Sequence, residues 1–320
     1  MLRVGVRVKM DGGQFRGGTT FIKALPLMAS ALVTLVIGGI AGLGFIVVQA
    51  GYEPPRPLSL LQPLYGGHWY LMILGFTLAL ISAELLTLLS MEWARRIAPP
   101  AVIAVFLASY WIGVMFYSMG YTLHALVASI VALSVATLYT ARTLLSKSWI
   151  GLPPTHYNYL LSLTPLITGI IIAYWIVSRE SGLPSYDLPV ATLFLPVAAI
   201  IAVESRDIPL LLGVPPTRSM ALRSKQLRVR AVLAYIMSGS GVLLISMGNL
   251  ALGGLLLIAG GILAASSVAL LQAVEISSTV IPREIRAHVA VHVAVSYTWF
   301  IGAGILATLY GSGYTGSIRI

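Results

Sequence analysis

Long apolar runs separated by short polar breaks are the feature that most constrains this chain. Runs of about 18 residues or more recur along its 320 residues, and each is long enough to cross the roughly 30 Å hydrocarbon core of a bilayer. Only 9% of the residues are charged, against about 25% in a typical soluble domain. A solvated surface cannot be built from this composition, so the sequence predicts an all-α, polytopic bundle in the cell membrane.

Proline, glycine and charged residues mark the breaks between these runs and predict nine transmembrane helices. The expected spans are 24–50, 69–91, 101–120, 122–145, 157–178, 187–205, 230–248, 250–273 and 287–310. The third and fourth spans are joined by almost no linker, and the seventh and eighth are joined at Gly248-Asn249. Both pairs are therefore expected to form tight antiparallel hairpins.

The distribution of basic residues predicts the orientation of the bundle. With the N-terminus inside and strict alternation, 17 of the 20 Lys and Arg residues fall on the inner side, and the other 3 are Arg56, Arg179 and Arg319. Cytoplasmic loops carry such an excess, so we expect N-in, C-out topology. The predicted organisation is a basic cytoplasmic segment over 1–23, a transmembrane bundle over 24–310 and a short external tail over 311–320. The net charge of +10 then reflects anionic lipid rather than nucleic acid.

Two compositional absences narrow the chemistry. The sequence has no cysteine, which excludes disulfides, thiolate nucleophiles and iron–sulfur clusters held by this chain. It contains neither a P-loop nor an acidic cluster for prenyl or sugar phosphates. Asn and Gln are also scarce, which is typical of proteins from thermophiles.

The five histidines are the main functional signal. In the predicted topology, His68 and His124 lie near the outer ends of the second and fourth spans. His156 begins the fifth span on the inner side, and His288 and His292 lie in the first turns of the ninth. Haem b takes two imidazoles from facing helices at matched depth. We therefore predict an outer haem held by His68 and His124. An inner one would be held by His156 with His292 or His288.

Two other interpretations of the histidines remain open. Histidines at helix ends are often interfacial and bond a loop carbonyl, without any ligand. His288 and His292, at i and i+4 on one helical face, can instead hold a metal ion together. HVAVH lacks the Glu of HExxH, so copper or haem iron is favoured over catalytic zinc. Under this interpretation His68 and His124 are also candidate metal ligands.

Glu84 is the one carboxylate deep in a predicted span. A buried acid there is expected to be protonated or partnered. We assign it a candidate role in proton transfer.

Glycines at helical spacing predict close helix packing. Gly38 and Gly42 form a GxxxG step in the first span, and paired glycines recur at 253/254 and 260/261 in the eighth. Small residues let helix backbones approach closely in lipid. We interpret these glycines as structural.

Three segments resemble the NnrS-like family of polytopic membrane proteins associated with haem and copper. They are GHWYLMILGF at 67–76 running on to Glu84, AVESR at 202–206, and SYTW at 296–299 followed by Gly302 and Gly304. The order and spacing agree over most of the chain. The arginine that usually follows the acidic residue is Leu85 here. Such proteins also continue with further histidine-bearing helices beyond the position of Ile320. If that part carries the metal site, the resemblance implies a degenerate relative, or a split one that a second protein completes.

A second resemblance, in size and span count, is to CbsB-type membrane subunits that accompany an extracytoplasmic b-type cytochrome in archaea. Both resemblances imply membrane redox work. The predicted function is that of a membrane subunit of an electron-transfer or respiratory complex, as a non-catalytic subunit of a membrane oxidoreductase. Its expected partners are the lipid bilayer and a cytochrome, Rieske or copper protein. The alternatives are a small-solute transporter or channel and a non-catalytic anchor or assembly subunit.

Overall fold

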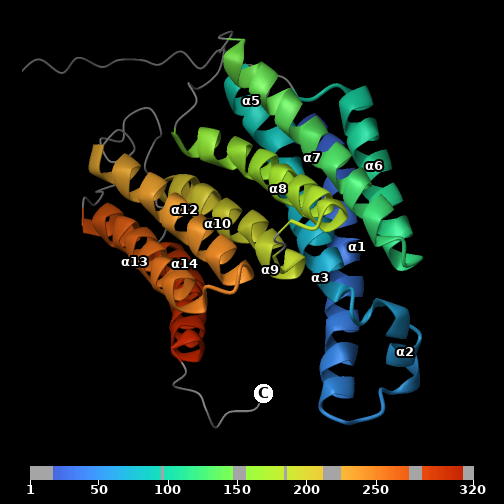
Figure 1. The fold of residues 1–320 in the computed structure, drawn as a ribbon. Helices are drawn as coiled ribbons and strands as arrows, with labels where there is room; N and C mark the ends of the chain where they lie inside the picture. Colours follow the sequence, from blue (N-terminus) through green and yellow to red (C-terminus); the bar gives the residue numbers. More distant parts are fainter. Residues whose placement is uncertain are drawn as a thin grey trace, which may run out of the picture.

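A computed structural model describes residues 17–94, 97–146, 156–183, 186–211, 225–273 and 283–312. Within these ranges the chain is helical without a strand, and nine helical rods run through the bundle, which confirms the predicted helix count (Figure 1). The rods are α1 (Gly17–Gln49), a second rod from α3 to α5 (His68–Ala94), α6 (Pro100–Ser118), α7 (Thr122–Leu145), α8 (His156–Ser181), α9 and α10 (Leu188–Thr192 and Phe194–Leu211), α12 (Lys225–Ser246), α13 (Leu250–Ala273) and α14 (Arg283–Gly311).

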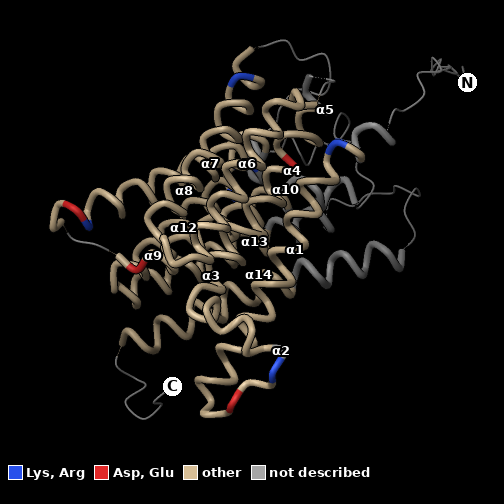
Figure 2. Tube along the Cα trace, turned by 90° about the vertical axis from the view of Figure 1, so that its right-hand side faces the viewer, with Lys and Arg blue, Asp and Glu red and all other residues tan. Residues whose placement is uncertain are grey.

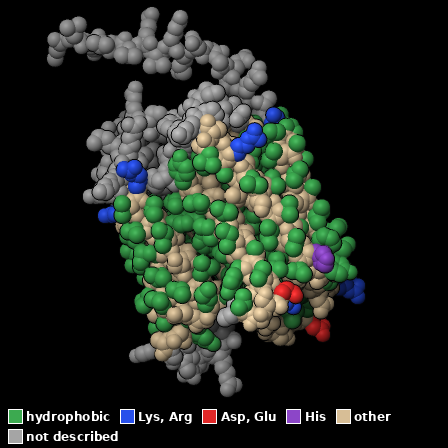
Figure 3. Space-filling view, turned by 45° about the horizontal axis from the view of Figure 1, so that its top comes forward, with side chains coloured by type: hydrophobic (Ala, Val, Ile, Leu, Met, Phe, Trp, Pro, Cys, Tyr) green, Lys and Arg blue, Asp and Glu red, His purple; other side chains and the backbone are tan. Residues whose placement is uncertain are grey.

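Over the described residues, six of these rods are long and apolar enough to cross a membrane: α1, the second rod, α6, α7, α8 and α12. The space-filling view shows a broad belt of hydrophobic side chains between an end with basic side chains and an end where acidic and basic side chains lie together (Figure 3). Large apolar side chains such as Leu32, Val105 and Ile170 are exposed on this belt. In water such a surface would be unstable, so these features indicate a multi-pass membrane protein.

The second rod is a single helix that widens twice into π-helical turns. It comprises α3 (His68–Tyr70), η2 (Leu71–Thr77), α4 (Leu78–Ala83), η3 (Glu84–Leu88) and α5 (Leu89–Ala94). The widening is visible in side-chain bonds that reach back five residues instead of four: Thr77 Oγ1 donates to the Met72 carbonyl, and Ser90 Oγ to the Leu85 carbonyl. It is also the most buried of the six candidate spans. π-helical turns are frequent at functional sites.

Both predicted hairpins form, and each turns at a glycine. Gly120 follows α6 and Gly248 follows α12, each with a φ of +83°. An L side chain rarely adopts this left-handed conformation, whereas glycine does so without steric cost. α6 thus packs along α7, and α12 along α13.

The order of packing across the bundle is simple. α1 lies against the second rod, whose C-terminal half (η3 and α5) packs on α7. α8 then lies between α7 and α10, and α10 packs in turn against α12, α13 and α14 (Figure 1). The sixth rod differs from prediction: it breaks at Leu193 between α9 and α10, with the Asp187 carboxylate accepting a bond from the Val190 amide at its start.

Candidate functional site

His68, at the start of the second rod, is held in one orientation by its neighbours. Its Nδ1 lies 2.7 Å from the Tyr65 carbonyl oxygen. A carbonyl can only accept a hydrogen bond, so Nδ1 carries the proton and Nε2 keeps its lone pair. The ring packs on Phe45 of α1 at a centroid distance of 5.3 Å. It also lies so close to Gly42 that a Cβ there would be 3.2 Å from His68 Cδ2.

His124 has a different environment, although it lies at the same end of the bundle. Its side chain is exposed, and its ring contacts Phe116 and Tyr121 at centroid distances of 5.4 and 5.8 Å. Among the contacts that the structure describes, no residue touches both the His68 and the His124 ring. Ligation of one outer haem by this pair therefore stays a prediction.

The three inner histidines are placed by backbone alone. His156 is the first residue of α8, and His288 and His292 lie in the first three turns of α14. Their side chains fall outside the described part of the chain, so the inner layer is untested. Among the side chains that are described, no three His, Asp or Glu residues gather in a way that could hold a metal ion.

Glu84 begins the second π-helical turn, η3, which packs against α1 and α7. Its side chain is half-buried. Neighbouring hydroxyls are buried with it: Thr87 donates to the Ala83 carbonyl, whereas the Ser82 hydroxyl has no partner in the described structure. The role of Glu84 in proton transfer stays a prediction.

An aromatic and hydroxyl cluster, absent from the sequence interpretation, joins the second rod to α6 and α7. Tyr70 is buried and stacks on Tyr117 of α6 at 4.1 Å, with the two rings nearly parallel. Trp69 meets both rings edge-on at 5.9 Å. The Tyr70 hydroxyl lies 2.8 Å from Ser129 Oγ, which donates in turn to the Ala125 carbonyl. The cluster thus begins at the residues that directly follow His68.

A second polar chain continues from α6 to α1. Tyr110 donates to Thr34 Oγ1 at 2.9 Å, and Thr34 donates to the Ser30 carbonyl. Trp111 Nε1 donates to Ser30 Oγ at 3.1 Å. The signal for this arrangement was Tyr110 and Tyr117, which lie seven residues apart and therefore on one face of α6. The sequence does not say that this face meets the second rod.

Comparisons with protein families, with characterised proteins and with solved structures found no match to this chain. The resemblances noted from the sequence are therefore untested.

Proposed function

We propose that this chain is an integral membrane subunit of an electron-transfer or respiratory complex, and that the second rod carries its functional residues. The observation that carries the proposal is the orientation of His68. A metal-binding histidine typically donates its second ring N–H to a carbonyl or carboxylate, which fixes the tautomer and directs the free nitrogen. The bond from His68 Nδ1 to Tyr65 supports that role.

His68 fits as one axial ligand of a haem b, or as a ligand of copper. A bound haem would supply one-electron transfer at the outer side of the membrane. The second ligand would come from His124 after a rearrangement of the α6–α7 turn, or from a partner protein. Glu84, further in along the same rod, would exchange protons with the inner side.

The described charges support the proposed orientation. Lys23, Arg142, Arg228 and Arg230 lie at helix ends that the alternation places inside. The opposite ends carry Glu53, Arg56, Arg179, Glu180 and Asp187. The tube view shows where these charges lie along the helices (Figure 2). An excess of basic residues favours the cytoplasmic side, so a cytochrome, Rieske or copper-protein partner would dock at the His68 end.

The test is the haem content of the purified chain, measured from reduced-minus-oxidised spectra and from the haem extracted per polypeptide. We expect the wild type to carry haem, and His68→Ala to lose at least about half of it. His124→Ala is the matched variant: an equal loss would make it the second ligand, and no loss would point to a partner. Wild-type protein that contains neither haem nor copper, purified from cells supplied with both, would end the proposal. Copper content measured on the same samples separates the two cofactors.

A second candidate, a small-solute transporter, is favoured by one observation. The second rod is widened at Glu84, and the sixth rod is broken at Leu193. Interrupted helices commonly form the solute and ion sites of transporters. Proton-coupled uptake in proteoliposomes that is abolished in Glu84→Gln would support this function. Uptake that is unchanged in this variant would exclude Glu84 as the coupling residue.

A further inference from the structure

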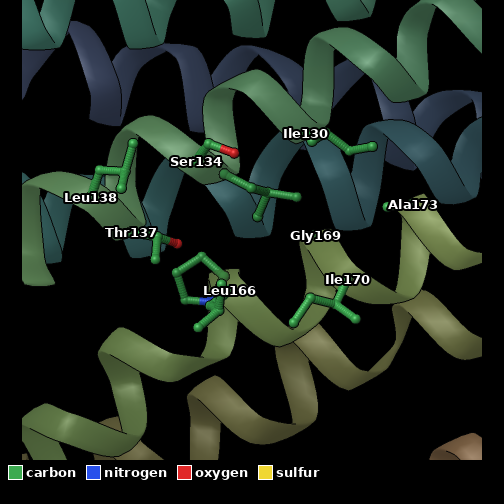
Figure 4. A pocket seen from close by; sticks show the side chains of 10 residues that line it. Ile130, Ser134, Thr137, Leu138, Leu166, Gly169, Ile170 and Ala173 are labelled. Carbon is green, nitrogen blue, oxygen red and sulfur yellow. The ribbon is translucent and has the colours of Figure 1, made fainter.

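A cavity of about 280 Å³ lies between α7 and α8, away from the His68 end. It is lined by Ile130, Leu133, Ser134, Thr137, Leu138, Pro165, Leu166, Gly169, Ile170 and Ala173. Its outer rim includes Leu138 and Ile170, which are 69% and 58% exposed, so it opens on the hydrophobic belt of the bundle. Figure 4 shows these side chains between the two helices.

The cavity exists because α8 presents little bulk at this level. Pro165 and Gly169 lie one helical turn apart on the face toward α7. A Cβ at Gly169 would meet Leu133 Cβ at 3.8 Å and Leu133 Cδ1 at 4.0 Å, which is ordinary contact. A methyl group therefore fits at Gly169, and the rest of a larger side chain there would take up space of the cavity.

Thr137 differs from three other hydroxyl residues on α7. Ser129, Thr140 and Thr143 each donate to a carbonyl one turn back. Thr137 is one of the residues that line the cavity, and its Oγ1, which is fully buried, has no hydrogen-bond partner in the described structure. A buried unpaired hydroxyl costs about 1–3 kcal/mol, so an occupant that accepts its hydrogen bond would be favoured.

Depth identifies the kind of acceptor. Thr137 lies eight residues before Leu145, the last residue of α7, which at 1.5 Å per residue is about 12 Å along the helix. α7 is 24 residues long, or about 36 Å, so this hydroxyl lies well inside a hydrocarbon core about 30 Å thick. The ester and headgroup oxygens of phospholipids remain near the surface. None of the ten lining residues is charged, so the occupant is neutral.

We propose that this cavity binds the head of a prenylated quinone. The Thr137 hydroxyl would donate to a ring carbonyl, and the isoprenoid tail would leave over Leu138 and Ile170 into the lipid. Ser134, three residues before Thr137 and on the same face of α7, would offer a second hydroxyl. The quinone is a membrane-soluble redox partner of the kind the proposed function requires. Its binding does not depend on His68 or on haem.

The experiment measures binding of a short-chain ubiquinone and a short-chain menaquinone to the purified full chain in detergent, by equilibrium dialysis. We expect saturable binding of at least one of the two. Thr137→Val, which removes the hydroxyl at constant shape, should weaken it about three- to tenfold, as expected for one neutral hydrogen bond. Gly169→Leu fills the cavity and should abolish binding.

The controls repeat the same changes away from the cavity. A Cβ at Gly39 on α1 would meet no atom within 4 Å, so Gly39→Leu adds the same side chain to an open surface. Thr140→Val removes a hydroxyl that bonds within its own helix. Neither should change the affinity. Absence of quinone binding to the wild type would overturn the proposal. So would affinities of Thr137→Val and Gly169→Leu that both equal the affinity of the wild type. Loss of co-purified phospholipid alone in Gly169→Leu would identify an acyl-chain groove instead, which would also overturn it.

Discussion

The two sides of this bundle are held together by different contacts. On one side, α6 is joined to the second rod and to α1 through rings and hydroxyls, as in the stack of Tyr70 on Tyr117 and the bond from Tyr110 to Thr34. On the other, α12, α13 and α14 meet through glycines. A Cβ at Gly253 would lie 2.7 Å from the Gly241 carbonyl oxygen, and one at Gly304 would lie 2.7 Å from that of Gly254.

The difference shows where this chain can carry chemistry. Lipid is as apolar as the helices, so helices associate by close van der Waals packing or by hydrogen bonds. Glycine contacts bring backbones together and leave no room between them. Ring and hydroxyl contacts hold helices further apart and place polar atoms inside the membrane. The oriented His68 and Glu84 both belong to the ring-and-hydroxyl side.

The strongest test of this contrast is Gly254→Ala. The added methyl group would lie 2.5 Å from the Gly304 carbonyl oxygen and 2.8 Å from the Thr308 amide nitrogen. Backbone atoms cannot move aside singly, so the α13–α14 pair must separate. We expect a loss of about 2–3 kcal/mol in unfolding free energy, measured by denaturation in detergent. Gly302→Ala, on α14 with no atom within 4 Å, should be neutral or slightly stabilising. Equal effects of the two changes would show that α13 and α14 do not pack through their glycines.

The matching change on the other side is Gly67→Ala. Its methyl group would meet the ring of Tyr117, with the ring hydroxyl oxygen at 3.0 Å. A side chain can rotate where a backbone cannot, so we expect a smaller loss of about 1 kcal/mol. The near-ultraviolet circular dichroism should also change as Tyr117 moves. Gly66→Ala, one residue earlier and with open space around it, is the control. A loss as large as that of Gly254→Ala would mean that the two sides are equally rigid.

Much of the glycine side was predictable, because its rules are local. Two glycine pairs at seven-residue spacing in one apolar run predict close packing whatever the partner helix. The structure places Gly253 against α12 and Gly254 against α14. The hairpin at Gly248 was likewise predictable from its short linker. The number of helices followed from the length of each apolar run.

The ring-and-hydroxyl side was harder to predict, because it depends on which helical faces meet. The sequence indicates that His68 and His124 lie at one level, but not that His68 faces Gly42 while His124 lies on the surface. The π-helical turns carry no signature in the apolar pattern. They are an outcome of packing, as is the break at Leu193.

The hydrogen bond between Tyr70 and Ser129 can be isolated by a double-mutant cycle. Tyr70→Phe and Ser129→Ala each remove one partner of the 2.8 Å contact. Such bonds inside membranes average about 0.6 kcal/mol. We expect a coupling free energy of about 0.5–1 kcal/mol from the four unfolding curves. Tyr121→Phe, which changes an exposed ring, supplies the control. Additive single effects would show that the stack on Tyr117, rather than the hydroxyl, holds Tyr70.

The smallest expected effect comes from Ser266→Ala. It is a serine-to-alanine change like Ser129→Ala, made on the glycine side of the bundle. The guanidinium of Arg230 on α12 donates to both the carbonyl oxygen and Oγ of Ser266 on α13, each at 3.3 Å. Alanine keeps the carbonyl, and Arg230, near the start of α12, is only part-buried. We therefore expect a loss below about 0.5 kcal/mol, smaller than that of Ser129→Ala under identical conditions. If Ser266→Ala destabilised the chain more than Ser129→Ala, polar contacts rather than glycines would hold α12 to α13, and the contrast between the two sides would fail.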